Sequence, residues 1–389
     1  MAATIRRENE ILAGQLLAQL EGSSVIDNTG RVVYQFEYEQ RIPCAFIGAG
    51  WHSYRNIYPA FQYAPIDLRA VCDLDVTRAA NYARIFGASA HYSDHWTMLN
   101  REKPTAVFIV TSYDPEGHVQ AVELALDCLS AGAHVWMEKP TASSTAEVKK
   151  LAAAAQEADR IVVTGMKTVF SPVMRKMKEI ISSPEFGAPS SIFVRYPLAM
   201  PEFGKRGSLI EMNWFLDCIF HPAAVLFNLM GPIDRIAYEW EAVAGASVTA
   251  IRFQSGAVGA LHLAAGSSSA GPVDRTEVVG KDANVVVDNG VKLTYYRAAP
   301  RSESGRAGSF IVPTENAPLC WEPEFAYGQL YNKNLFYLGY VDEVVYFCDC
   351  VMRGTAPSRG SLDVAFRILE LFEVYRQVKP GTWVTLGGS

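Results

Sequence analysis

The sequence predicts an α/β fold in which a parallel sheet comes first and a largely antiparallel sheet follows. Two observations support this prediction. From residue 42 to about residue 166, short apolar runs alternate with alanine- and leucine-rich helical stretches, which is typical of βαβ units. After about residue 171, two helical segments give way to one strand-like run after another, which favours antiparallel pairing.

The individual elements follow from these patterns. The first half contains five expected strands: Cys44–Gly48, Leu68–Cys72, Ala106–Thr111, Ala133–Met137 and Ile161–Thr164. Helices are expected in the first half at Gly117–Ala131 and Ser144–Ala158, and in the second half at Val173–Ile181, Trp214–Leu229, Leu335–Arg353 and Leu362–Arg376. The second-half strands are Ile192–Tyr196, Ile236–Ala242, Ser247–Phe253, Val258–Ala264, Arg275–Val279 and Ala283–Val287. A stretch rich in Pro, Gly and Ser, Arg297 to Tyr331, is expected to be a loop.

Residues 1–41 precede this regular pattern and are expected to form an N-terminal arm. Leu12, Leu16 and Leu20 recur at helical spacing, which predicts one amphipathic helix over residues 6–21. A short strand is expected at Val32–Phe36. The sequence leaves open whether the arm docks on its own chain or contacts another subunit.

Composition limits the possible partners. The chain has 389 residues, enough for about two domains, and it is 49% hydrophobic and 20% charged. Its net charge is −6 and its isoelectric point is about 5.7, so no overall basic field favours nucleic acid or an anionic membrane. No run approaches the roughly 18 apolar residues of a membrane span.

The N-terminal residues and the cysteines predict a cytoplasmic protein. Arg6 and Arg7 could begin an export signal, but Glu8 and Glu10 follow at once and no small-residue cleavage site is present. The seven cysteines are scattered and match neither a zinc site nor a disulfide framework. We therefore expect reduced thiols and no bound metal.

A glycine-rich turn follows the first expected strand. In Phe46–Ser53 the first glycine, Gly48, allows a tight turn, and the second, Gly50, lets the backbone approach a pyrophosphate. The next strand ends at Asp73, about 20 residues further on, where a carboxylate accepts hydrogen bonds from a ribose diol. Asp73 favours NAD because it would repel the extra phosphate of NADP. Arg78 offsets part of that repulsion, so NADP stays the less favoured alternative.

Lys139 stands at the end of another buried strand, in the run Ala133–Pro140. The proline pushes Lys139 out of the helical region, so that the lysine is held extended. The carboxyl ends of parallel strands are where such sheets bind ligands. On spacing alone the run fits a solvated lysine at a strand-to-helix turn as well as a catalytic or cofactor-contacting lysine.

Together these features resemble the Gfo/Idh/MocA oxidoreductases, a family that includes glucose–fructose oxidoreductase and inositol dehydrogenase. The resemblance spans about residues 42–386. It rests on Gly48-Ala49-Gly50, Asp73, Thr111-Ser112, Gly132-x-His134-Val135, Glu138-Lys139-Pro140, the Asp217-x-x-x-His221 pair and Arg353-Gly354-x-x-Pro357. Of these, the Glu-Lys-Pro element is the most specific.

The resemblance implies a fold and an activity. It implies an N-terminal NAD-binding Rossmann domain at residues 42–166 and a substrate and oligomerisation domain at 167–389, whose final helices can pack back on the first. The second domain is an α/β domain with a large open sheet, through which members commonly form homodimers or homotetramers. Members typically transfer hydride between a secondary alcohol of a sugar or cyclitol and a nicotinamide.

The resemblance also assigns site residues. His221 is the proton acceptor, Asp217 is its partner, and Lys139 is the cation that polarises the reacting oxygen; histidine suits this role because its pKa lies near ambient pH. The expected cofactor-binding residues are Gly48, Gly50, Trp51, His52, Ser53, Asp73, Thr111, Ser112, Glu138 and Lys139. Lys167, Arg195 and Trp214 are candidate substrate-binding residues.

The sequence departs from the family pattern near these residues. Pro222 follows His221 directly and is expected to kink or restart the helix. Ile219 and Ala224 replace a glycine and a second aspartate that relatives often carry, and Lys167 and Val169 stand where an asparagine and an arginine are usual. These changes indicate a substrate pocket that has diverged.

Three functions remain open at this point. The leading one is an NAD-dependent dehydrogenase acting on a sugar, cyclitol or glycoside. The second is a redox-neutral enzyme, of the glycosidase or internal oxidoreductase type, that retains NAD. The third is a dinucleotide-sensing regulator without catalysis, in which Asp217 would cap a helix and His221 would be a core residue.

Overall fold

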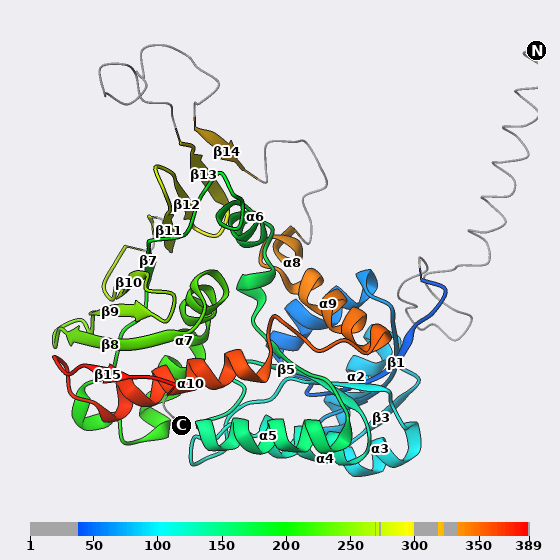
Figure 1. The fold of residues 1–389 in the computed structure, drawn as a ribbon. Coiled ribbons are helices and arrows are strands. Elements are labelled where there is room, and N and C mark those ends of the chain that lie inside the picture. The colour runs from blue at the N-terminus through cyan, green and yellow to red at the C-terminus, as the bar shows by residue number, and fades with distance from the viewer. Residues whose placement is uncertain (1–37, 269, 272–273, 299–317, 323–332, 388–389) are drawn as a thin grey trace, which may run out of the picture.

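The structure, a computed structural model, describes residues 38–268, 270–271, 274–298, 318–322 and 333–387. Two sheets with their covering helices make up this part of the chain (Figure 1). The predicted α/β class is confirmed. The expected arm helix at residues 6–21, the strand at Val32–Phe36 and most of the loop at 297–331 lie outside the described residues.

The first sheet has six strands, and every neighbouring pair is parallel. Its strands are β1 (Ile42–Ile47), β2 (Ile66–Cys72), β3 (Ala90–Tyr92), β4 (Ala106–Ile109), β5 (His134–Glu138) and β6 (Val162–Gly165), in the order β3-β2-β1-β4-β5-β6. All four residues of β4 are buried, as continuous apolar runs predict for a sheet covered on both faces. The strand order reverses between β1 and β4, and such a reversal opens a ligand crevice at the carboxyl ends of the strands.

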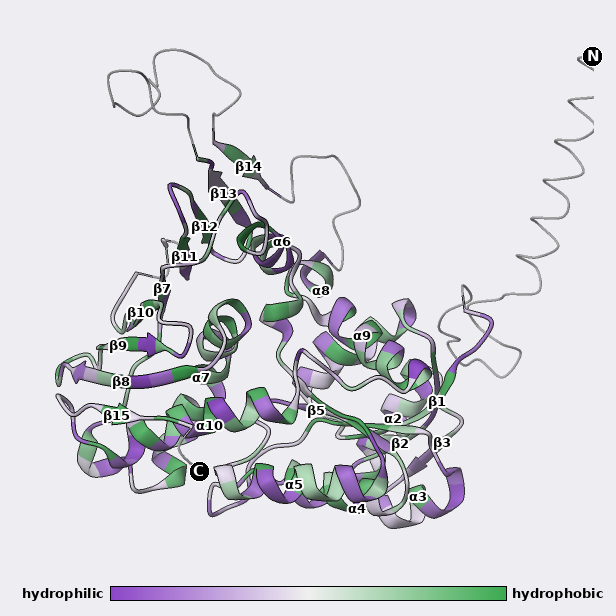
Figure 2. Cartoon of the chain, in the orientation of Figure 1, coloured by the Kyte–Doolittle hydropathy of each residue, from purple (hydrophilic) through white to green (hydrophobic). Residues whose placement is uncertain are grey.

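Helices cover both faces of this sheet. One face carries α3 (His95–Glu102), α4 (Ala121–Ser130) and α5 (Thr145–Ala158); the other carries η1 (Ser53–Ile57), η2 (Tyr58–Tyr63) and α2 (Val76–Phe86). The side chain of Asp75 caps α2 by accepting from the backbone N–H groups of Thr77 and Arg78. Figure 2 shows hydrophobic colour along the central strands and mixed colour along α5, whose outer face meets solvent.

The second sheet has nine strands in the order β14-β13-β12-β11-β7-β10-β9-β8-β15. They are β7 (Ser191–Tyr196), β8 (Ile233–Trp240), β9 (Ser247–Phe253), β10 (Val258–Leu263), β11 (Arg275–Val279), β12 (Asn284–Asp288), β13 (Lys292–Tyr296), β14 (Leu319–Trp321) and β15 (Val384–Thr385). Only β7 and β10 pair in parallel. In β9 buried and exposed residues alternate, because one face packs against helices and the other does not.

The remaining helices join the two sheets. They are η3 (Lys167–Phe170), α6 (Pro172–Ile181), η4 (Phe203–Lys205), α7 (Leu209–Met230), α8 (Lys333–Tyr337), α9 (Tyr340–Arg353) and α10 (Leu362–Gln377). Residues of α9 share one hydrophobic core with β1, β4 and η2, whereas α10 packs on both α5 and α7. The parts of the chain that carry the two sheets are therefore held together by helices from the C-terminal end.

Three local expectations differ from the structure. The helix expected at Leu335–Arg353 is two helices, because Gly339 has a positive φ of 90° and ends α8. The helix expected from Gly117 begins at Ala121. The helix that contains Pro222 does not restart there: α7 is continuous for 22 residues, and its burial outweighs the roughly 3 kcal/mol that an internal proline costs.

Within the described residues, α7 is also the one helix long and apolar enough to cross a membrane by length and composition alone. Most of its side chains from Met212 onward are buried against the second sheet and α10. It also carries Asp217 and His221. These contacts are those of a core helix.

Candidate active site

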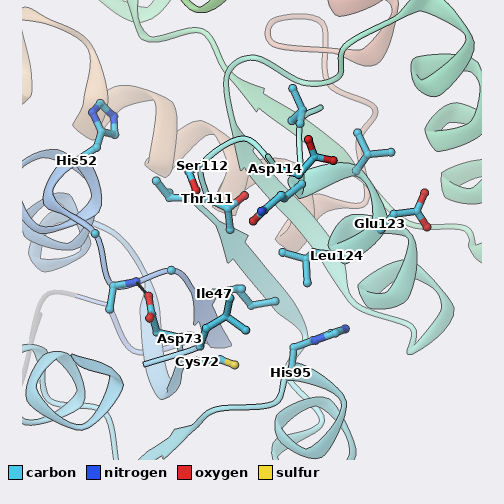
Figure 3. A pocket seen from close by; sticks show the side chains of 18 of the residues that line it. Ile47, His52, Cys72, Asp73, His95, Thr111, Ser112, Asp114, Glu123 and Leu124 are labelled. Atoms are coloured by element: carbon cyan, nitrogen blue, oxygen red, sulfur yellow. Dashed lines mark hydrogen bonds between the residues drawn. The ribbon is translucent and has the colours of Figure 1, made fainter. Parts of the chain in front are cut away.

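A cavity of about 950 Å³ lies at the carboxyl ends of β1, β2 and β4. Its lining contains seven of the residues expected to bind a cofactor: Gly48, Gly50, Trp51, His52, Asp73, Thr111 and Ser112. Figure 3 shows Asp73 and His52 well apart within it, with Thr111 and Ser112 between them. We refer to this space as the cofactor cavity.

The glycine turn forms one wall of the cofactor cavity. Gly48 has φ 112°, and a Cβ on it would lie 1.9 Å from the carbonyl oxygen of Val110, so only glycine fits. At Gly50, by contrast, nothing lies within 4 Å of an added Cβ. Gly50 thus leaves an open cradle in which a pyrophosphate can approach the backbone, and the residues present fit a dinucleotide.

Ser53 does not line the cavity but stabilises this turn through hydrogen bonds to its backbone. Its hydroxyl donates to the carbonyl oxygen of Gly50 at 2.8 Å, and its oxygen accepts from the Gly50 N–H at 3.1 Å. The helical segment that follows begins as a π-helix, η1, and continues as the 3₁₀-helix η2. The turn therefore leads into irregular helix, which the sequence did not indicate.

Asp73 occupies the far end of the cavity. Its carboxylate accepts hydrogen bonds from the N–H groups of Ala49 at 2.7 Å and Asp75 at 2.9 Å (Figure 3). The guanidinium of Arg78 donates to the same carboxylate at 2.9 Å and also lines the cavity. A carboxylate and a guanidinium therefore stand side by side where the sequence placed a ribose.

Lys139 and Asp217 meet although they are far apart in the sequence. The ammonium of Lys139, at the end of β5, donates to Oδ1 of Asp217, on α7, at 2.8 Å. The Lys139 side chain is only 10% exposed, whereas that of Asp217 is 32% exposed and accessible from outside. The expected partner of Asp217 was His221, but the structure gives its carboxylate to the lysine.

His221 lies one helical turn after Asp217 on the same side of α7. Its Nδ1 is 3.4 Å from the hydroxyl of Thr168, a contact that the sequence did not indicate. Burial, aided by the charges of Lys139 and Lys167, lowers the pKa of His221 well below its usual value. The imidazole is therefore neutral at ordinary pH and able to accept a proton.

A second cavity, of about 240 Å³, opens beside His221. Its polar lining includes Lys167, Thr168, Tyr196, Asp274 and Asn289. Burial raises the pKa of Asp274 from its usual value. Asp274 directly precedes β11 and Asn289 directly follows β12. No local motif marks either residue, so the sequence did not indicate them.

The other two expected substrate residues differ in position. Arg195 contributes to the lining of the second cavity, although on β7 its side chain alternates with Val194 and Tyr196 and points to the face that carries His262. Trp214 is 70% exposed, one turn before Asp217 on α7, and lines neither cavity. Lys167 and Arg195 therefore contribute to the same cavity as His221, whereas Trp214 does not.

A cluster of ionisable side chains separates the two cavities, and we call it the buried cluster: His52, Glu138, Lys167, Tyr340 and Glu343. Nε2 of His52 is 3.6 Å from Oε1 of Glu138, and the ring of His52 packs edge-on against that of Tyr340. The ammonium of Lys167 lies 4.7 Å from the centre of the Tyr340 ring. Glu343, one turn further along α9, is completely buried.

Burial dominates the charges in this cluster. It raises the pKa of Glu138 to about 7, against the opposing effect of Lys139 and Lys167, and it raises that of Glu343 well above its usual value. It lowers the pKa of His52 to about 4 and also lowers that of Lys167. Within the described ranges, no group of three or more His, Cys, Asp or Glu side chains could hold a metal ion.

Comparison with known proteins agrees with this geometry. Residues 42–166 match the Gfo/Idh/MocA oxidoreductase family, NAD-binding Rossmann fold. The scyllo-inositol 2-dehydrogenase (NAD(+)) of Bacillus subtilis is 24% identical over 85% of this chain and 92% of its own length. The NADP(+)-dependent scyllo-inositol 2-dehydrogenase of the same organism is 25% identical over 72% of this chain and 85% of its own length.

Solved structures share the fold over most of the chain. An oxidoreductase from Agrobacterium radiobacter, in complex with NAD+, L-tartaric acid and magnesium, has a TM-score of 0.72 at 15% identity and covers 90% of this chain and 99% of its own. A dehydrogenase from Chromobacterium violaceum has a TM-score of 0.69 at 20% identity and covers 86% and 94%, respectively.

Proposed function

Because this chain belongs to the Gfo/Idh/MocA family of NAD(P)-dependent oxidoreductases acting on CH–OH groups, we propose that it transfers hydride between nicotinamide and a secondary alcohol of a sugar, cyclitol or glycoside. The relatives that act on inositols support a polyol substrate. The observation that carries the proposal is the Lys139–Asp217 contact, which joins the cofactor-binding sheet to the helix that carries His221.

In the proposed reaction each residue handles a proton or a charge. The bound nicotinamide supplies the hydride acceptor. Lys139, fixed by Asp217, polarises the reacting oxygen and stabilises the negative charge that develops there. His221, whose imidazole is neutral before the reaction, accepts the hydroxyl proton; because burial and two lysines make it a weaker base, it relies on Lys139 to make the hydroxyl more acidic. In this arrangement Asp217 orients the lysine, and Thr168 orients the histidine.

The second cavity is the proposed place for the body of the substrate. It adjoins His221, and its carboxyl, amide, hydroxyl and ammonium groups match the hydroxyls of a polyol. Lys167 is the proposed substrate-binding cation there. Arg195 also lines this cavity, whereas Trp214 does not and is assigned no role in the subsite.

NAD is the proposed cofactor, although one relative uses NADP. The fixed carboxylate of Asp73 suits the ribose diol of NAD and disfavours an additional phosphate. Arg78, paired with Asp73, lessens that discrimination.

We further propose a cytoplasmic homodimer or homotetramer. All seven cysteines are free thiols, which fits a reducing compartment. The face of the second sheet opposite α6 and α7 presents exposed Val248 and Val258, which an identical face in a second copy would cover. Light scattering coupled to size-exclusion chromatography measures the oligomeric state.

A panel of sugars, cyclitols and glycosides with NAD or NADP tests the proposed activity through the absorbance of the reduced cofactor. We expect stoichiometric reduction of NAD by at least one polyol, and loss of that activity in His221→Ala. Turnover without net reduction, by protein that retains NAD, would instead establish the redox-neutral alternative. Binding of NAD without turnover of any compound would contradict the dehydrogenase proposal.

A further inference from the structure

The buried cluster reaches both cavities of the site. His52 lines the cofactor cavity, and Lys167 lines the second cavity. Glu138 faces His52, while Tyr340 contacts both the His52 ring and the Lys167 ammonium. A change of charge in the cofactor cavity therefore acts on ionisable groups that extend to the proposed substrate pocket.

The shape of its surroundings places Glu138 in this cluster. Its residue pairs with Gly165 across β5 and β6, and a Cβ on Gly165 would lie 2.6 Å from Oε2 of Glu138. The missing side chain of Gly165 is thus the space that the carboxylate occupies. Among the described residues Oε2 has no hydrogen-bond partner, Oε1 is 3.6 Å from Nε2 of His52, and a hydrogen bond from the backbone N–H of Lys139 favours the ionised form.

His52 presents a hydrogen to this carboxylate. The side-chain amide nitrogen of Asn56 lies 3.3 Å from Nδ1 of His52, and an amide N–H can only donate to it. The proton of the neutral imidazole therefore resides on Nε2, the atom that faces Glu138. The side chain of His52 is 39% exposed, although its Nε2 is buried.

The two buried carboxyl groups are not equivalent. Both oxygens of Glu343 lack a hydrogen-bond partner of good geometry in the described part of the chain, and burial raises the pKa of this carboxyl group well above its usual value. Glu138 has a pKa of about 7, because Lys139 and Lys167 oppose the effect of burial. His52 is neutral, Lys139 is paired with Asp217, and Lys167 is the remaining cation. Glu138 is therefore the carboxyl group of the cluster that changes charge near neutral pH.

We propose that Glu138 exchanges a proton with every change in the charge of the bound nicotinamide, so that cofactor binding and proton binding are linked. This inference rests on the proposed function. The oxidised ring is positively charged and favours the carboxylate; the reduced ring is neutral and favours the carboxylic acid. In the oxidation of an alcohol the ring takes the hydride and His221 takes the hydroxyl proton; passage of that proton from His221 to the ionised Glu138 then restores the neutral imidazole. The net charge of the site then stays constant through the reaction.

Titration calorimetry of the whole protein tests the linkage without turnover. NAD+ and NADH are each titrated at pH 7 in two buffers with different enthalpies of ionisation, and the difference in heat gives the number of protons released. With a pKa of about 7, Glu138 is about half protonated at pH 7, so NAD+ should release about 0.3–0.5 proton per site. NADH should release fewer protons or take some up, and Glu138→Gln should abolish the difference between the two cofactors.

The matched control is Glu123→Gln, which removes an exposed carboxylate that lines the same cavity and should retain the proton release. Equal proton numbers for NAD+ and NADH in the wild-type protein would overturn the inference and leave the proposed oxidoreductase intact; this comparison does not depend on any variant folding. Proton release that persists in Glu138→Gln would overturn it as well. If neither dinucleotide binds, the proposed function fails, and the inference fails with it.

Discussion

Two acidic side chains at opposite ends of the site, Asp73 and Glu138, are held in different ways. At one end of the cofactor cavity, two backbone N–H groups and Arg78 fix the carboxylate of Asp73 in a single orientation. At the other end Glu138 lies next to His52 and against Gly165, outside the cavity lining; its Oε2 has no hydrogen-bond partner among the described residues, and a hydrogen bond from the backbone N–H of Lys139 only partly offsets its burial. An acid surrounded by donors recognises a ligand by its hydrogen bonds, whereas a buried acid with few donors responds to charge.

Removal of Lys139 should have the largest effect, and it should be confined to the Glu138 end. In Lys139→Ala the reacting oxygen loses its cation and Asp217 loses its partner, so we expect kcat to fall about 10³-fold. Dinucleotide affinity, set mainly by the Asp73 end and the glycine turn, should change much less. Steady-state kinetics and cofactor titration measure the two quantities.

Lys150→Ala is the matched control, because Lys150 pairs with Glu123 on the surface and is 58% exposed. It should leave kcat unchanged. A Lys139→Ala protein with nearly normal kcat would remove the lysine from the proposed mechanism.

The two glycines of the turn after β1 should affect different properties: Gly48 the stability of the fold and Gly50 the binding of the dinucleotide. Gly48→Ala forces a Cβ into the Val110 carbonyl at a positive φ, so we expect a loss of about 3 kcal/mol or more in the free energy of unfolding. Gly50→Ala meets no atom within 4 Å and should fold normally, yet its methyl group would occupy the cradle proposed for the pyrophosphate. We expect its dinucleotide affinity to fall about 10- to 100-fold.

Urea denaturation and calorimetric titration of both variants measure these effects. Normal cofactor affinity in a stable Gly50→Ala protein would place the pyrophosphate elsewhere in the cavity.

Local sequence patterns were sufficient for most of the fold. The continuous apolar runs of β1, β4 and β5 identified the parallel sheet, since strands buried on both faces need few polar residues. The strands β3, β13, β14 and β15 were missed, and β14 lies within the stretch expected to be a loop. Three of them, β3, β14 and β15, have only two or three residues, too few to show a period. Pro222 was expected to restart its helix; tertiary burial of α7 prevailed over that local preference.

The candidate site was predictable only where chain order determines position. Asp73 and Lys139 follow directly from their places at strand ends, and Gly48 and Gly50 from the turn after β1. The ion pair between Lys139 and Asp217 joins elements 78 residues apart, and Glu343 arrives from a helix near the C-terminus. Contacts of this kind depend on how helices pack, which the spacing of residues along one segment does not encode.

The pH dependence of stability should distinguish the Glu138 end from the rest of the chain. The pKa of Glu138 is raised in the folded protein from 4.5 to about 7, so its contribution to stability is present below pH 4.5 and is lost as the pH rises through 7. The full loss is about 3.5 kcal/mol, since the shift of about 2.5 units is worth about 1.4 kcal/mol for each pKa unit, and about 2.5 kcal/mol of it falls between pH 5 and pH 8. Glu138→Gln should therefore be less destabilised than the wild type on going from pH 5 to pH 8.

The measurement is urea unfolding of both proteins at each pH. His52, with a lowered pKa, contributes in the opposite direction between pH 6.5 and about 4, so only the difference between variant and wild type isolates Glu138. Glu179→Gln, at an exposed carboxylate of α6, serves as the control. Identical pH profiles for Glu138→Gln and the wild type would show that Glu138 does not titrate in this range.

The smallest effect is expected at the Asp73 end. Asp73→Ser removes the carboxylate that disfavours a phosphate on the ribose. Arg78, which pairs with that carboxylate, then becomes available to pair with the phosphate of NADP. We expect the ratio of kcat/KM for NAD to that for NADP to fall about tenfold, while proton release on binding of NAD+ stays as in the wild type. Arg78→Ala should shift the same ratio toward NAD. An unchanged ratio of kcat/KM for NAD to that for NADP in Asp73→Ser would show that other residues recognise the ribose. Asp73 would then not act through hydrogen bonds to the ligand, and its contrast with Glu138 would be lost.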